Sequence, residues 1–201
     1  MALSAQRDTG VPELIADVVA ARRQLAIATS GLTVEQGAFR PDPDTWSIRA
    51  IVEHLVLASQ NGINMIWQAV EGLEQGQPAW TGEHTNRGRS IEQIIETTWP
   101  VVDQGPLTVR TSLKAPPLAD PSDRGPLDYW LVALEALQLP MERLGDRLIG
   151  VDLESVIFPH FQCGPMDARQ RFEFLAWHIR HHLQQIEEEI KADGRWPGQS
   201  A

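Results

Sequence analysis

Residues 173–186 read EFLAWHIRHHLQQI, and this stretch decides the fold. Five apolar side chains in and around it fall within roughly 60° of one another at about 100° per residue: Phe172, Ile179, Leu183, Ile186 and Ile190. This spacing predicts an amphipathic helix with one buried face. His178 and His182 are one turn apart at the margin of that face, so their imidazoles leave the helix together. His181 points to nearly the opposite face and is expected to be solvent-facing.

Three further long helices follow from the same periodicity. The first spans residues 12–30, with Pro12 suited to a helix start and Gly31 to a helix end. The second begins near Thr45 or Ser47 and runs to about Leu73. The third covers residues 127–148 and should be kinked or split by Pro140. The last helix, which carries the histidine pair, is expected to start at a cap formed by Asp167 with Gln170 and to run to about Ala192.

The connections contain a single short helical turn, one short helix and several loops. Capping-box patterns at residues 33–36 (TVEQ) and 90–93 (SIEQ) each predict a short helical segment, the second of which ends at Trp99. Residues 101–126 contain five prolines and are predicted to be irregular or briefly extended, and residues 151–164 to be a loop. These features predict an all-α fold: a four-helix bundle with a short extra helix and a proline-rich irregular connection, in one domain over residues 1–201.

The composition excludes several classes of function. The chain has 201 residues, and its formal net charge of −10 disfavours binding to nucleic acid or to an anionic membrane surface. No apolar run approaches the roughly 20 residues that span a bilayer, and residues 1–10 lack the design of a secretory signal. The only cysteine is Cys163, so no intrachain disulfide can form. A cytoplasmic location is therefore expected.

Three histidines suggest a metal site. His178 and His182 have the spacing with which one helix offers a metal two nitrogens. His54, in the second predicted helix, lies roughly 60° beyond Ile51, again at the margin of a buried stripe. If the fold brings His54 to the pair, three neutral imidazoles surround a divalent ion and leave one coordination position open, which is typical of catalytic sites. On spacing alone, histidines held by ordinary structural hydrogen bonds are an equally valid interpretation.

Three segments together resemble the DinB-like (DinB/YfiT-like) superfamily of metalloenzymes. The first is the entry to the second helix, RPDPDTWSI at residues 40–48 followed by EHL at 53–55. The second is FPHF with GPM at residues 158–161 and 164–166, before the last helix. The third is WH at 177–178 through HH at 181–182 and QI at 185–186. The order and separation of these segments carry the resemblance across most of the chain.

The resemblance implies a four-helix bundle, a divalent metal held by His54, His178 and His182, and frequent homodimers. It also implies a small-molecule substrate and, as in characterised relatives, a low-molecular-weight thiol such as bacillithiol, mycothiol or glutathione as co-substrate. Zinc, nickel and iron are not distinguished, because imidazole suits all of them.

Three functions remain open at this stage. The first is a metal-dependent thiol S-transferase acting on small electrophiles, with the thiol activated at the open metal position. The second is a metal-dependent hydrolase, which needs a general base; Glu189, one heptad after His182, is the nearest carboxylate, although residues 187–189 more often form a solvated charge run. The third is a non-enzymatic metal-binding or interaction bundle. No catalytic residue is assigned.

Other candidates carry weaker signals. Cys163 and His160 lie just before the last helix and are expected to be a packed thiol and a loop hydrogen-bonding group, although either can approach the pocket. His84 carries no signal. Glu53 points away from His54 and is a poor hydrogen-bond partner for it. Three carboxylates of the third helix are left as candidate partners of the histidines: Asp128, Glu135 and Glu142.

Overall fold

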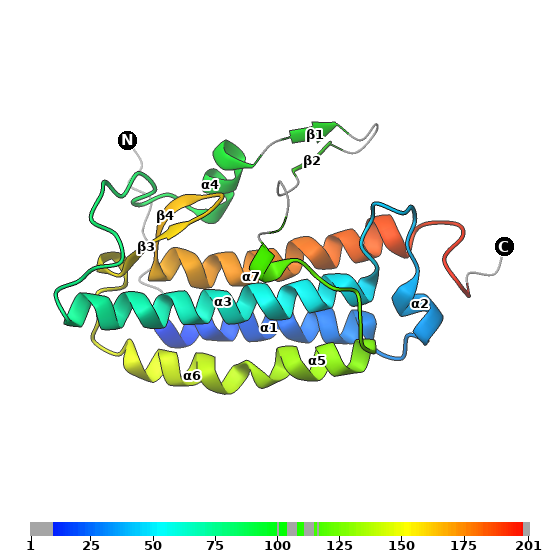
Figure 1. Cartoon of the computed structure of the whole chain (residues 1–201), viewed down its shortest axis with the longest axis horizontal. Helices are drawn as coiled ribbons and strands as arrows, with labels where there is room; N and C mark the ends of the chain where they lie inside the picture. The colour runs from blue at the N-terminus through cyan, green and yellow to red at the C-terminus, as the bar shows by residue number, and fades with distance from the viewer. Residues whose placement is uncertain (1–9, 100, 104–107, 111–114, 116, 199–201) are drawn as a thin grey trace.

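The chain folds around four long helical segments. A computed structural model describes residues 10–99, 101–103, 108–110, 115 and 117–198. The segments lie side by side (Figure 1): α1 (Val11–Thr29), α3 (Ile48–Glu74), α7 (Ala168–Gln185), and the consecutive helices α5 (Leu127–Ala136) and α6 (Gln138–Arg147). A π-helical turn, η3 (Ile186–Ile190), follows α7 directly. The predicted helical-bundle class is confirmed.

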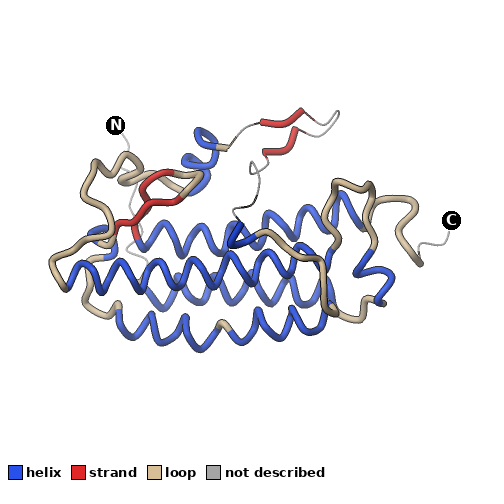
Figure 2. Tube along the Cα trace, in the orientation of Figure 1, coloured by secondary structure: helices blue, strands red, loops and turns tan. Residues whose placement is uncertain are grey.

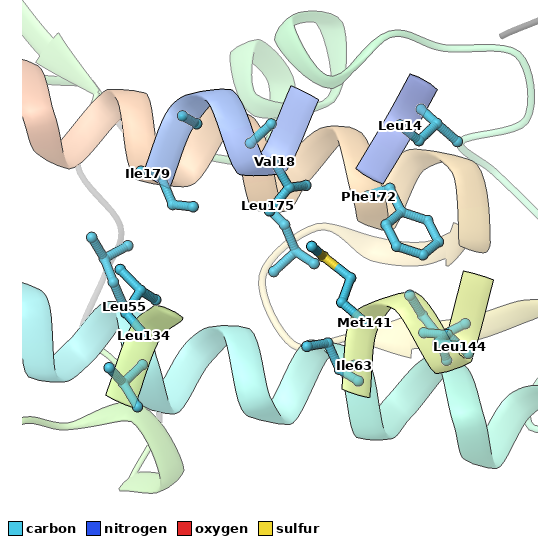
Figure 3. Packing of buried hydrophobic residues seen from close by; sticks show 14 of the residues in the cluster. Leu14, Val18, Leu55, Ile63, Leu134, Met141, Leu144, Phe172, Leu175 and Ile179 are labelled. Atoms are coloured by element: carbon cyan, nitrogen blue, oxygen red, sulfur yellow. The ribbon is translucent and has the colours of Figure 1, made fainter. Parts of the chain in front are cut away.

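The bundle core is made by apolar faces from all four segments. Figure 3 shows side chains from each of them meeting between the helices. Val18 of α1, Leu55 of α3, Met141 of α6 and Phe172 of α7 are each almost completely buried. α1 packs along α7, and α3 packs against α5. Because each helix buries one stripe at helical spacing, the apolar periodicity of the sequence translates directly into this core.

The third predicted helix is split in two. α5 ends at Ala136 and α6 begins at Gln138, with Leu137 between them. Pro140 is thereby the third residue of α6, where a missing backbone N–H costs little because first-turn amides have no intrahelical partner. The expected kink or split is confirmed.

The helix starts follow their predicted caps. The Ser47 side chain accepts the Ala50 amide at the start of α3. Asp167 forms a capping box with Gln170 at the start of α7. Two short elements also start with capping boxes: α2 (Val34–Ala38), where a single turn was predicted, and α4 (Ile91–Thr98), the predicted short helix.

A small hairpin replaces most of the loop predicted for residues 151–164, and that prediction is wrong there. After a short 3-10 turn, η2 (Leu153–Ser155), strand β3 (Ile157–His160) pairs antiparallel with β4 (Gly164–Asp167). Figure 2 shows this hairpin beside α7. Four-residue strands give too short an alternation to be recognised in a sequence, and the pairing depends on Gly164, whose φ of 77° only glycine adopts freely.

The proline-rich connection contains brief regular elements. Strand β1 (Val101–Asp103) pairs with β2 (Thr108–Arg110), and a 3-10 turn, η1 (Pro117–Ala119), precedes α5. The prediction for residues 101–126 is thus confirmed where the structure describes them; its remaining positions lie outside the described residues. No described helix has the length and apolar character to cross a membrane.

Candidate metal centre

The fold brings the three predicted histidines together. α3 contributes His54, and α7 contributes His178 and His182. His178 Nε2 lies 3.2 Å from His54 Nε2 and 3.1 Å from His182 Nε2. All three residues are buried, each with 5–7% of its surface exposed. Among the described residues, this is the cluster that has the donor set and spacing of a metal site.

Hydrogen bonds behind two of the rings fix their orientation. His54 Nδ1–H donates to the Ala119 carbonyl of η1 at 2.6 Å, and His182 Nδ1–H donates to Gln185 Oε1 at 2.9 Å. Gln185 also hydrogen-bonds the Glu189 carboxylate, so its NH₂ group serves the carboxylate and its oxygen serves the imidazole. Both histidines therefore turn an unprotonated Nε2 toward the centre of the cluster.

This arrangement fits a divalent cation better than it fits three free imidazoles. His54 Nε2 and His182 Nε2 both face His178 Nε2, and a neutral His178 can donate only one proton to the two of them. A metal ion accepts all three lone pairs at once. Two nitrogens bound tetrahedrally at about 2.0–2.1 Å from zinc lie roughly 3.3–3.4 Å apart, close to the 3.1 and 3.2 Å separations. The cluster can thus hold a metal ion.

The electrostatics keep the rings neutral, which is the ligating form. Burial lowers the pKa of His54. Burial, together with the neighbouring histidines, lowers the pKa of His178 and of His182 well below the usual histidine range. Aromatic rings pack around the imidazoles. The ring centres of Trp46 and His54 are 4.8 Å apart, and Phe174 stacks on His178 with ring centres 5.3 Å apart.

A cavity of about 410 Å³ opens beside the cluster. α3 supplies His54, Ala58, Asn61 and Met65, and α7 supplies Arg171, Phe174 and His178. The rest of its described wall comes from Trp99 after α4, from Ala115 and the following turn η1, and from the end of β3 with the β3–β4 turn. None of these described lining residues is acidic. Its size suits a small molecule.

Polar contacts hold the hairpin against this cavity. Asn86, from the loop between α3 and α4, donates to the carbonyls of Cys163 and Pro165. The Gln170 side chain donates to the Asn86 carbonyl, and His84 Nε2 contacts Gln170 Oε1 at 3.2 Å. His84, which carried no signal in the sequence, therefore belongs to the support of the hairpin.

His160 and Cys163 both follow their expected roles. His160 Nδ1 accepts the Cys163 amide at 3.2 Å, and the ring lines the cavity. Burial lowers the pKa of His160 to about 2, so this imidazole is neutral. Cys163 is buried among apolar side chains, and burial raises the pKa of its thiol.

Other predictions about individual residues had mixed outcomes. The expectation that His181 faces solvent is wrong: it is half-buried, stacked 5.0 Å from Trp177 and edge-on to Trp99 at 5.8 Å. The end of α4 covers that face of α7, which helix periodicity alone cannot show. Glu53 is confirmed as no partner of His54, because its carboxylate accepts hydrogen bonds from Ser122 and Asp123.

The partners of the histidines differ from the carboxylates considered. A backbone carbonyl and a glutamine amide receive the Nδ1–H groups of His54 and His182, in place of Asp128, Glu135 or Glu142. Glu189 reaches the cluster only through Gln185 and does not line the cavity.

The sequence reasoning missed Arg171. It lies seven residues before His178, within roughly 20° of it on a helix, so continuing the histidine stripe toward the N-terminus of α7 would have found it. Its side chain lines the cavity.

Residues 18–186 match the family model of the DinB superfamily, and the chain belongs to this superfamily. The match covers most of the chain and all three clustered histidines. No curated protein and no solved structure is significantly similar to it.

Proposed function

We propose that this protein is a metal-dependent thiol S-transferase that acts on small electrophiles, with His54, His178 and His182 as the metal ligands. One observation carries the proposal: a cluster of three histidines, two of which (His54 and His178) line the wall, adjoins a small-molecule cavity whose described lining contains no carboxylate, serine or cysteine. Such a site has the means to activate an external nucleophile but offers none of its own.

A divalent metal, when bound, lowers the pKa of a coordinated thiol and supplies thiolate at neutral pH. The protein orients the reactants. Ala119 and Gln185 hold the rings of His54 and His182, and Phe174 and Trp99 provide apolar walls that exclude water. In the reaction the sulfur forms a bond to the electrophilic carbon, the carbon–leaving-group bond breaks, and the thiol proton passes to solvent.

Transfer is favoured over hydrolysis by the absence of a base in the described cavity wall. Water activation benefits from a general base within hydrogen-bond reach of the nucleophile. His160 is the one other imidazole of the described wall, and its Nδ1 is already an acceptor for the Cys163 amide. A thiol needs no such base, since coordination alone delivers the thiolate.

The first test is metal content by elemental analysis of protein purified without a His-tag. We expect about one metal ion per chain in the wild type, none in His182→Ala, and an unchanged content in His181→Ala. The His181→Ala control removes an imidazole of α7 that is not part of the cluster. Absence of metal in the wild type, before and after titration with zinc, nickel or iron, would make the histidines structural and favour a non-enzymatic bundle.

The second test measures thiol consumption with 1-chloro-2,4-dinitrobenzene as electrophile, in metal-loaded and metal-free protein. Conjugation that requires both metal and His182 is expected. Ester or amide hydrolysis without conjugation, across several thiols and electrophiles, would replace the transferase with the hydrolase.

A further inference from the structure

Arg171 is a buried cation that forms no ion pair with any residue that the structure describes. Only 3% of its surface is exposed, and its Nε and Nη1 atoms have no hydrogen-bond partner among the described residues. Burial lowers the pKa of the guanidinium to about 10, so it is still charged at neutral pH. Buried charges are normally paired, because removing an ion from water is costly. An unpaired guanidinium in the wall of a cavity therefore calls for an anion from outside the protein.

The neighbouring helix is shaped around this guanidinium. A Cβ added at Gly62, in the middle of α3, would lie 2.8 Å from both Nε and Nη2 of Arg171. Glycine inside a helix costs about 1 kcal/mol relative to alanine. Here the absence of a Cβ leaves the space that the Arg171 guanidinium occupies. The guanidinium carbon also lies 5.1 Å from the centre of the Phe174 ring. The cation is thus packed in a fixed position beside the cavity.

The remaining polar groups of the cavity also favour an anion. His160 accepts a hydrogen bond at Nδ1, so its Nε2 carries the proton and is a donor. The three clustered histidines are neutral, so a bound divalent ion would keep its full double positive charge. The described wall contains no carboxylate to balance these charges.

Neither the neighbouring thiol nor a comparison with the other buried arginine changes this conclusion. Cys163 lies close enough to Arg171 for an electrostatic interaction, but burial raises its pKa and keeps the thiol neutral. Arg22 is another buried arginine without a hydrogen-bond partner among the described residues, but the hollow that it lines, between α1 and α5, also contains Glu135. The combination of an unpaired cation and a described wall without acids is specific to the cavity at the histidine cluster.

We propose that Arg171 is the anion-binding residue of this cavity, and that the substrate carries a carboxylate which pairs with its guanidinium while the reacting end lies at the histidine cluster. Arg171 and His178 are about two turns apart on one face of α7, roughly 10 Å along the helix, so a small molecule of about that length spans them. A carboxylate matches the planar guanidinium and forms paired hydrogen bonds with it. This inference rests on the proposed function, which identifies the reacting end of the substrate as the part that lies at the histidine cluster. The carboxylate can belong to the thiol or to the electrophile.

Calorimetric titration with matched probes tests the assignment. The thiol pair is 3-mercaptopropionate and its neutral amide, and the electrophile pair is 4-chloro-3-nitrobenzoate and its neutral amide. Each probe is titrated into zinc-loaded and metal-free protein, as wild type, Arg171→Gln and Arg143→Gln. The control loses the same charge on α6, where the Arg143 side chain is 71% exposed.

We expect the wild type and Arg143→Gln to bind the carboxylate member of at least one pair about tenfold or more tightly than its amide. Arg171→Gln should lose this preference while its affinity for the amide stays the same. The pair that shows the effect identifies whether thiol or electrophile carries the anion. Gly62→Ala, which displaces the guanidinium without removing it, should reduce the same preference and serves as the second variant if Arg171→Gln does not fold.

Two results would overturn the assignment: no carboxylate preference in the wild type for either pair, or a preference that survives in Arg171→Gln. Failure of the proposed function has a different signature. In that case zinc-loaded and metal-free protein bind the thiol probes equally, while the Arg171-dependent preference can still be measured with the electrophile pair.

Discussion

Replacing Arg171 with methionine should stabilise the metal-free protein. Burial lowers the pKa of the guanidinium from its usual value to about 10, and each pKa unit corresponds to about 1.4 kcal/mol. The shift therefore corresponds to about 3 kcal/mol of destabilisation. The sign follows from the protonation states: below pH 10 the folded and unfolded chains both carry the charge, but only the folded chain holds it away from water. The penalty is fully present at pH 7 and disappears only above the pKa of the unfolded chain.

Part of this gain is offset by contacts that Arg171 makes. Its guanidinium carbon lies 5.1 Å from the Phe174 ring centre, a contact that contributes about 1 kcal/mol. Methionine keeps the apolar stem and adapts to irregular space. The net expectation is an increase of about 2 kcal/mol in the free energy of unfolding. For a chain of this length, that raises the melting temperature by roughly 4–8 °C.

Urea denaturation at pH 7 in the presence of a chelator measures this change. Arg143→Met, which removes an exposed charge, should stay within about 0.5 kcal/mol of the wild type. A loss of 1 kcal/mol or more in Arg171→Met, with the control unchanged, would refute the reasoning. Such a loss would mean that the protein itself pairs the guanidinium, and the need for an external anion would disappear.

Three further predictions concern the surroundings of the cluster. Gln185→Leu removes the acceptor of the His182 Nδ1–H group and should weaken zinc affinity by about 10- to 100-fold in a competition titration; unchanged affinity would show that the amide does not hold the ring. The folded pKa of His160, about 2, is far below the usual 6.5. Below pH 6.5 the unfolded chain therefore binds a proton at this residue that the folded chain does not, and the metal-free protein loses stability. His160→Gln should therefore reduce the slope of unfolding free energy between pH 6 and 4.5 by about 1.4 kcal/mol per pH unit, and an unaltered slope would contradict its neutral burial. Gly62→Ala should destabilise the wild type but stabilise Arg171→Met by up to about 1 kcal/mol, because the clash at 2.8 Å involves only the guanidinium; equal effects in both backgrounds would place the clash elsewhere.

The helices could be predicted because their signals are local. Capping side chains at Ser47, Ser90 and Asp167 mark starts that the structure reproduces, and the apolar stripes identify the buried faces. The β3–β4 hairpin could not be predicted in the same way. Its strands have four residues each, and its position depends on Asn86 bonding to carbonyls 77 and 79 residues away.

The candidate site was predictable in its centre and not in its walls. Periodicity placed His178 and His182 on one face and His54 at the margin of a second buried stripe, and the family resemblance implied that the three share one metal. The carbonyl of Ala119 and the position of His181 depend on how η1 and α4 pack against the bundle, which no helical pattern encodes. Arg171 could have been predicted from the same helical periodicity that located the histidines, because it lies seven residues before His178 on the same face.

The cavity is the part of the protein where ligands would relieve several unfavourable features together. Three imidazole nitrogens face one another with too few protons to satisfy them, and Arg171 is charged and has no ion-pair partner in the described part of the chain. Gly62 weakens the interior of α3 to make space for that charge. A divalent cation resolves the first feature and a carboxylate the second, and each also compensates part of the charge of the other. This coupling predicts that a carboxylate probe binds more tightly when zinc is present, and reciprocally that the probe strengthens zinc binding by the same factor. If the two bind independently, the metal and the anion do not share one site, and the cavity does not hold a substrate between Arg171 and the histidines.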